Sequence, residues 1–338
     1  MPGIVGDGSE VKILPRRIGV RVPHFDIVGL AAVNVEAKNG RIAAQASFND
    51  FELDATDDDL LVASGKRFSL AATTAGADLC AVPQVEVALH LEEAKAPTLK
   101  FLDRYIPEGT GIVLKGGGGR IAVDATLSTR TQRAQGKLSL RGTNVELHNR
   151  GAQVMGALEV NAVMREFDLR TRAVDLAGSE LKMTDVLVST PLERYPSVWL
   201  TAVATEARFA PGTKHPWRAS LGISARNLQP LLAVVSGNLK IPRWVVGSLD
   251  LPGAAAKVEL DVEGKNVSLA PLTLRTDGIS VDARVVLKEL PDKNLEPHGV
   301  GLLRLGPFEA GMQIDGGTIT PVLLGAKQWY AAQLDGGS

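Results

Sequence analysis

Apolar and polar residues alternate along most of this 338-residue chain, and this period of two restricts its fold more than any other feature. Successive side chains of a β-strand point to opposite faces, so the alternation predicts strands with one apolar and one polar face. It recurs in 41–53, 136–148, 156–163, 178–189, 217–226 and 256–287. In the stretch 217–226 (WRASLGISAR), the residues that share the apolar side are Trp217, Ala219, Leu221, Ile223 and Ala225.

Turn residues separate these segments at the spacing typical of antiparallel all-β proteins. The chain has 35 glycines, while aromatic residues make up only 4% of it. The composition therefore predicts many turns and apolar faces built from Val, Leu, Ile and Ala. We expect about 20 strands of ordinary length. The predicted fold class is mainly all-β, an elongated and curled antiparallel sheet that forms a groove, with two short helices.

Two segments interrupt the alternation, and both read as short helices. The first, 98–106, begins at Thr98, which is predicted to be its N-cap, and the second, 227–237, begins at Asn227 and ends at Gly237. Each follows a strand and leads through an Ile-Pro pair into further strands, which predicts a unit of about 130 residues used twice. The expected divisions are an N-terminal β region over 1–95 and two helix-plus-strands units over 96–226 and 227–338, together forming one continuous elongated sheet.

Four consecutive glycines at 116–119, within KGGGGRIAVDATL, invite comparison with ligand-binding loops. Gly111 and Gly116 have P-loop spacing, but Gly117 stands where the motif needs lysine. A dinucleotide fingerprint opens a helix, whereas 121–127 alternates like a strand. The calcium repeat needs an acidic residue where this chain has Ile121. The tract is therefore predicted to be a flexible turn between strands at 112–114 and 121–127.

Catalytic and metal-binding patterns are weak in this sequence. The five histidines lack partners at i+3 or i+4, and the acidic stretch 52–59 lacks the order of an EF-hand, so it reads as a solvated loop. There is one cysteine, Cys80, and no Gly-X-Ser-X-Gly elbow. The net charge of −1 argues against nucleic-acid binding. We expect a protein without catalytic residues, metal or cofactor.

Because no apolar run approaches the ~20 residues of a membrane span, we expect the chain to be soluble or to be an excerpt of a protein anchored elsewhere.

What the sequence has in excess is apolar strand faces, because no long amphipathic helix is predicted to cover them. A sheet buries such a face either by closing into a sandwich or barrel, or by curling into an open trough that holds acyl chains. An apolar trough suits hydrocarbon, since burial of each methylene is worth ~0.8 kcal/mol. The residues predicted to line it are Leu138, Leu140, Leu158, Val160, Leu181, Met183, Ala219, Leu221, Ile223, Val258 and Leu260.

The stretches GKLSLRGTNVELHNRGAQVMGALEV, LAGSELKMTDVLVS and ISARNLQPLL resemble the AsmA-like and TamB-like repeating β-groove proteins of bacterial envelopes. The shared sequence patterns are G-x-L-x-L-x-G, S-x-L-x-M-x-D-V-x-V and a strand that leads into N-L-x-P-L-L. The resemblance extends over about residues 95 to 330. The resemblance implies a periplasmic protein that carries phospholipid along its groove. It also implies association with the inner membrane, through a segment outside this chain, or with membrane-anchored envelope proteins.

Three functions remain open at this stage. The first is non-catalytic binding and passage of phospholipid or another acyl lipid. The second is a structural component of the envelope or of an appendage, with closed apolar faces and no lipid. The third is an enzyme such as a polysaccharide-acting β-solenoid.

Overall fold

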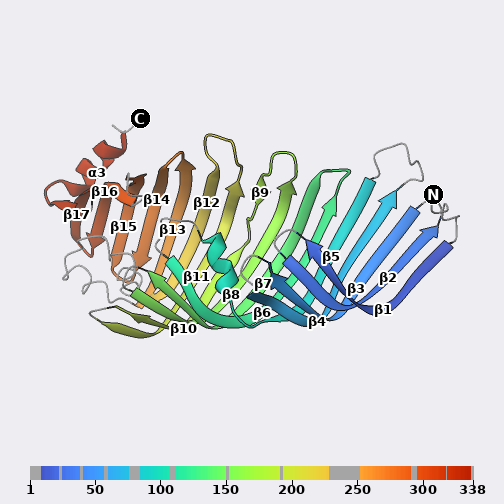
Figure 1. The fold of residues 1–338 in the computed structure, drawn as a ribbon. Coiled ribbons are helices and arrows are strands. Elements are labelled where there is room, and N and C mark those ends of the chain that lie inside the picture. Colours follow the sequence, from blue (N-terminus) through green and yellow to red (C-terminus); the bar gives the residue numbers. More distant parts are fainter. Residues whose placement is uncertain are drawn as a thin grey trace. The chain divides into compact units, whose positions relative to one another are not determined.

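The structure, a computed structural model, describes residues 9–22, 25–38, 41–56, 60–75, 84–106, 112–149, 152–190, 193–227, 252–290, 295–316 and 318–335. Most of these residues lie in β-strands (Figure 1). The mainly β fold class and the presence of a sheet are thereby confirmed.

The strands of the first half of the chain are β1 (Ser9–Val22), β2 (Phe25–Lys38), β3 (Arg41–Ala55), β4 (Leu60–Ala75), β5 (Gln84–Ala96), β6 (Ile112–Ser128), β7 (Arg133–Asn149), β8 (Ala152–Asp168) and β9 (Val174–Asp175). Those of the second half are β10 (Glu180–Ser189), β11 (Arg194–Phe209), β12 (Trp217–Asn227), β13 (Pro252–Glu263), β14 (Asn266–Thr276), β15 (Ile279–Glu289), β16 (Leu295–Leu305), β17 (Phe308–Asp315) and β18 (Thr318–Val322). The described helices are η1 (Lys100–Tyr105) and α3 (Ala326–Asp335).

Chain neighbours are also neighbours in the sheet. Each strand from β2 to β6 pairs antiparallel with the one before it, and so does each strand from β11 to β18. This is the connectivity that short polar turns favour, because two antiparallel strands need only a hairpin between them. The predicted antiparallel meander is therefore confirmed for these strands.

The described chain divides into two compact units. The first comprises Met1–Asp103, Gly116–Asn144 and Glu159–Val174, and the second comprises Arg104–Lys115, Val145–Leu158 and Asp175–Ser338. The first unit contains β1 to β5, and the second contains β10 to β18 together with α3. The division into 1–95, 96–226 and 227–338 stays a prediction.

The predicted turn at the tetraglycine tract is wrong. Residues 116–119 lie inside β6, which runs without interruption from Ile112 to Ser128. Small residues are required at Gly118 and Gly119 because the backbone of other segments passes very close to them. A Cβ at Gly118 would stand 3.0 Å from the carbonyl oxygen of Pro97, and one at Gly119 would overlap the carbonyl oxygen of Arg141. Glycine here marks close backbone approach, which is the other known use of this residue within strands.

The two predicted helices fare differently. The segment 98–106 contains η1, a 3-10 helix, and the hydroxyl of Thr98 accepts a hydrogen bond from the Lys100 N–H at 3.2 Å. The Leu99 N–H donates to the Gly117 carbonyl at 2.8 Å, which fixes η1 to the glycine tract. The second predicted helix lies outside the described residues, except that Asn227 ends β12. Sequence reasoning missed α3 altogether.

Candidate functional site

Rows of apolar side chains cross the strands of the second unit. Residues directly opposite each other in an antiparallel pair point to the same face of the sheet, so successive pairings trace a row across several strands. One row runs through Leu181, Ala202, Ile223, Ala256, Leu274, Val281, Leu303 and Ala310. The next runs through Ala204, Leu221, Val258, Leu272, Ala283, Gly301 and Met312. A third runs through Ala207, Ala219, Leu260, Leu269, Val285, Gly299 and Ile314.

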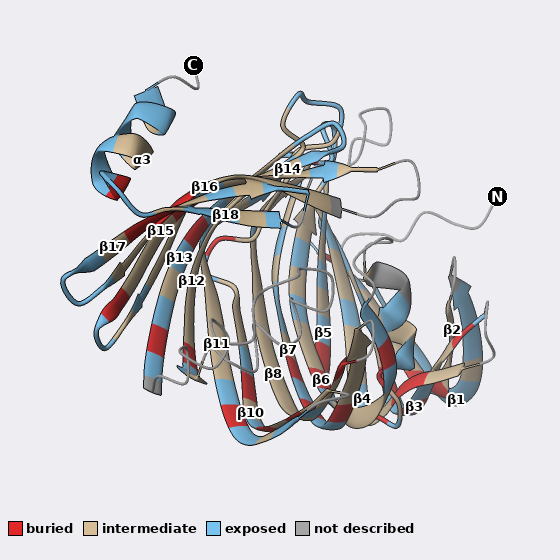
Figure 2. Cartoon of the chain, turned by 90° about the vertical axis from the view of Figure 1, so that its left-hand side faces the viewer, coloured by how far each residue is buried: buried red, intermediate tan, exposed pale blue. Residues whose placement is uncertain are grey.

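These three rows form what we call the apolar face of the second unit. None of their members carries a charge or a polar side chain. Val258 is buried, with 9% of its surface exposed, but Leu221 and Leu260 beside it are only half-buried. Figure 2 shows the same mixture along β12 to β16, where intermediate residues predominate. At the edges of the face, Trp217 is 43% exposed and Phe308 is 49% exposed.

The helix α3 packs on the opposite face of this sheet. Leu302 pairs with Gly311, one residue out of phase with the apolar rows, so both lie on the other side. The Trp329 ring lies directly over Gly311, because a Cβ at Gly311 would stand 2.5 Å from its Cε3 atom. Leu302 is only 1% exposed beneath the helix. Among the described elements of the second unit, α3 packs on the sheet through contacts with β16 and β17, on the face opposite to the apolar rows.

The opposite face is polar and carries ion pairs. The Asp282 carboxylate lies 2.6 Å from Nη2 of Arg275 and 2.6 Å from Nη1 of Arg304, and Arg304 also reaches Glu309 at 3.4 Å. Burial alone would raise the pKa of Asp282, but the hydrogen bonds from the two arginines outweigh it, and the pKa lies below its ordinary value. Burial, followed by the charge of Asp282, raises the pKa of Tyr330 on α3.

A buried cluster interrupts the half-exposed apolar side chains at β10 and β11. Met183, Val186, Val188 and Val198 are its buried members. The side chains packed around them include Leu147, Val154, Leu158, Leu181, Tyr195 and Leu200. This cluster is a buried core within the second unit, and Leu181, the first member of the first apolar row, packs against it.

The first unit carries equivalent rows, which form the apolar face of the first unit. One runs through Val11, Val35, Ala44, Ala72, Val87 and Leu127, and another through Ile13, Val33, Ala46, Leu70, Leu89 and Ala125. A third runs through Arg16, Ala31, Phe48, Phe68, Leu91 and Val123. In this third row the Phe48 and Phe68 rings pack with centroids 5.7 Å apart. Arg16 is the one charged member of the three rows.

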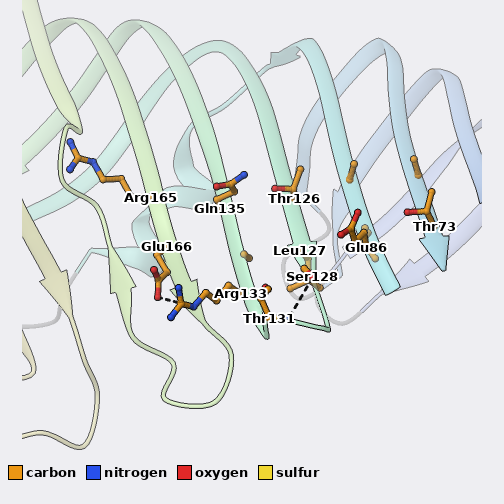
Figure 3. Close-up of a pocket in the computed structure, with 14 residues that line it drawn as sticks. Thr73, Glu86, Thr126, Leu127, Ser128, Thr131, Arg133, Gln135, Arg165 and Glu166 are labelled. Carbon is orange, nitrogen blue, oxygen red and sulfur yellow. Dashed lines mark hydrogen bonds and ion pairs between the residues drawn. The ribbon is translucent and has the colours of Figure 1, made fainter. Parts of the chain in front are cut away.

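A pocket of about 550 Å³ with both polar and apolar lining residues lies in the first unit (Figure 3). Thr73 pairs with Glu86 and Glu86 with Ser128, one residue out of phase with the apolar rows. Arg133 and Glu166 form an ion pair at 3.3 Å across the pocket wall. Among the described residues, no group of three or more His, Cys, Asp or Glu side chains is arranged to hold a metal ion. The pocket is open to solvent.

The structure brings together most of the residues predicted to line a groove. Ala219 faces Leu260, Leu221 faces Val258, and all of these share the apolar face of the second unit with Ile223 and Leu181. Leu158 and Met183 belong to the buried cluster at its end. Leu138, Leu140 and Val160 lie in the first unit, where Leu140 is buried and Leu138 is exposed.

Sequence reasoning did not include β15 to β17 or β1 to β5 among the candidate positions. The signal was present in the same alternation, for example in Val281, Ala283, Val285 and Leu287 of β15. Arg16 was missed because its side is not set by simple alternation: β1 pairs Ile13 with Val33 and Arg16 with Ala31, so Leu14 and Pro15 form a bulge opposite Ala32.

Comparison with known protein families, with curated proteins and with solved structures found no match to this chain. Within the described part of the chain, no helix has the length and apolar character needed to cross a membrane. The class of protein is therefore defined by the fold and the site alone: a mainly β protein with long apolar sheet faces.

Proposed function

We propose that the apolar faces bind the acyl chains of phospholipid or another acyl lipid and allow the lipid to pass along them, without catalysis. The observation that carries the proposal is the uncharged row from Leu181 to Ala310, which crosses eight strands beside two further uncharged rows. Its central members are half-buried by their own neighbours and stay accessible from one side. In this proposal the sheet curls into an open groove, and the protein works in the bacterial envelope at or near the inner membrane.

The dimensions of the rows suit hydrocarbon. Strands lie about 4.8 Å apart, so eight strands span roughly 34 Å. The hydrocarbon core of a bilayer, which holds two acyl chains end to end, is about 30 Å thick. Each methylene transferred from water to an apolar surface contributes ~0.8 kcal/mol. A face of this length without a charge therefore favours continuous contact with acyl chains at every position along it.

Leu221→Asp tests the proposal at the centre of the face. Leu221 lies between Ala204 and Val258 and is half-buried. On an open face the new carboxylate stays hydrated, so the protein stays folded and loses bound lipid. On a face closed against another layer, the same carboxylate is buried without a partner, which costs several kcal/mol and unfolds the sheet. Circular dichroism and mass spectrometry of co-purified lipid measure the two properties separately.

Ser224→Asp is the matched control. Ser224 lies in the same strand but on the opposite face, between Thr201 and Ala255, where no carboxylate is adjacent. Ser220 is a poorer control, because it pairs with Glu206 and Glu259 and a third carboxylate there would add repulsion. We expect Ser224→Asp to keep both fold and lipid. A folded Leu221→Asp protein with undiminished lipid contradicts the proposal, and an unfolded one supports the closed structural role.

Tryptophan quenching locates the lipid. Trp217 pairs with Val262 on the apolar side of β12, whereas Trp199 lies between Val198 and Leu200 and points to the opposite face. Proteins that retain only one of these tryptophans are mixed with phospholipid that carries bromine on its acyl chains. We expect strong quenching of Trp217 and little of Trp199, although both are substantially exposed. Equal quenching of the two would refute binding on the apolar face.

A further inference from the structure

The first strand places one cation on the apolar face of the first unit. The bulge at Leu14–Pro15 places Arg16 opposite Ala31. Ala31 pairs in turn with Phe48, and Phe48 with Phe68, so Arg16 belongs to the third row of that face. Arg16 is exposed at the beginning of this row, beside the exposed side chains of Val11 and Ile13. A guanidinium therefore lies at the end of an otherwise apolar surface.

The charge of Arg16 is not neutralised by a described carboxylate. The other cations of β1 have partners, since Lys12 lies 2.8 Å from Glu10 and Arg21 lies 2.8 Å from Asp26. Arg16 and its neighbour Arg17 take part in no ion pair or hydrogen bond with the described side chains. Arg17 pairs with Leu30 and so points to the opposite face. The two arginines thus carry the same charge on opposite sides of one strand.

The local backbone favours a ligand other than an added strand. Pro15 has no N–H to donate, and the bulge and adjacent arginines are features that discourage strand addition. Leu14 within the bulge is 77% exposed, which adds further apolar surface beside the cations. A single cation at the margin of an apolar face matches an amphiphile with an anionic end.

We infer that Arg16 binds the phosphate of an anionic phospholipid whose acyl chains lie along the apolar face of the first unit. Guanidinium and phosphate pair through two parallel N–H···O hydrogen bonds, which fixes the headgroup at the end of the row. A headgroup without an ammonium group, such as that of phosphatidylglycerol, brings no cation to oppose Arg16. The inference rests on the proposed function and adds the headgroup class and its position.

The experiment uses the full chain incubated with vesicles of equimolar phosphatidylglycerol and phosphatidylcholine. After the vesicles are removed, mass spectrometry gives the ratio of the two lipids that remain bound. We expect phosphatidylglycerol to be enriched on the wild type, and Arg16→Gln to reduce that enrichment about fivefold. Arg16→Lys should retain part of it. Arg17→Gln removes the same charge from the opposite face and should leave the ratio unchanged.

The outcomes separate this inference from the proposed function. If the wild type retains neither lipid, the proposed function fails and the inference fails with it. If it retains both lipids without preference, the function stands and the inference is overturned. Equal losses of phosphatidylglycerol enrichment in Arg16→Gln and Arg17→Gln would overturn the inference, because they would indicate diffuse attraction to the anionic vesicle surface and not a defined site. Displacement of phosphatidylglycerol by excess inorganic phosphate would identify a free phosphate site and overturn the role of the acyl chains.

Discussion

Replacing the four glycines at 116–119 one at a time by alanine tests whether the tract is a close-packed part of a strand. A methyl group at Gly116 would have no atom within 4 Å, whereas a methyl at Gly119 would overlap the Arg141 carbonyl oxygen and stand 3.1 Å from its carbon. Gly117 has a φ of 114°, a conformation that strains any residue with a side chain. The four positions therefore differ in cost, although the sequence makes them look equivalent.

The magnitudes follow from these environments. Gly116→Ala should stabilise the protein by about 0.4–1 kcal/mol, because it only restricts the unfolded chain. Gly119→Ala should destabilise it by about 1–3 kcal/mol, because the atoms in the way are backbone and β7 has to move. Gly117→Ala should cost about 1–3 kcal/mol through strain. Gly118→Ala should fall between the extremes, since its methyl would stand 3.0 Å from the Pro97 oxygen.

Urea unfolding followed by circular dichroism measures these differences as shifts of the transition midpoint at constant slope. The informative quantity is the difference between Gly116→Ala and Gly119→Ala, two variants with the same chemistry in one strand. If all four variants lay within about 0.5 kcal/mol of the wild type, the tract would behave as an exposed flexible turn. That result would refute the close approach of Arg141 and Pro97 to β6.

Two further predictions concern the polar face of the second unit. Gly311→Ala should displace α3, because the new methyl would stand 2.5 Å from Trp329 Cε3. We therefore expect faster hydrogen exchange over 326–335. Gly222→Ala is the control: the nearest atom to its methyl lies at 4.0 Å, so exchange over 326–335 should not change. Asp282 has a lowered pKa in the folded protein, so its contribution to stability is complete above its ordinary value of 3.8 and disappears as the pH falls through the lowered pKa. Asp282→Asn should therefore reduce the dependence of Tm on pH in this acidic range. If the variant showed the same fall of Tm at low pH as the wild type, the ion pairs of Asp282 with Arg275 and Arg304 would be contradicted.

The alternation in the sequence predicted strands over segments such as 41–53, 178–189 and 217–226, and it predicted which of their residues share a side. In β12 the predicted side of Ala219, Leu221 and Ile223 is the side that pairs with apolar residues on β11 and β13. Such local reading succeeds because the period of a strand depends only on its own backbone geometry. The short segment at 98–106 was equally readable, since Thr98 supplies a local cap.

Long-range packing decided the features that the sequence did not reveal. The glycines of 116–119 look like a turn when read alone, and only the approach of Pro97 and Arg141 shows why they lie within a strand. The helix α3 is short, and its position depends on Gly311 and Leu302 of two earlier strands. The sequence of 326–335 alone therefore does not predict where this helix packs.

Arg16 shows the difference most directly. Continuing the alternation of Val11 and Ile13 would place Pro15 and Arg17 on the apolar side and Arg16 on the polar one. The bulge at Leu14–Pro15 adds one residue to β1 and reverses this assignment for the residues that follow. A shift of one residue exchanges the two faces of a strand, and the pairing partner rather than the local sequence selects that shift. The sequence determined that β1 has an apolar and a basic side, and only the pairing with β2 decided which arginine faces the apolar rows.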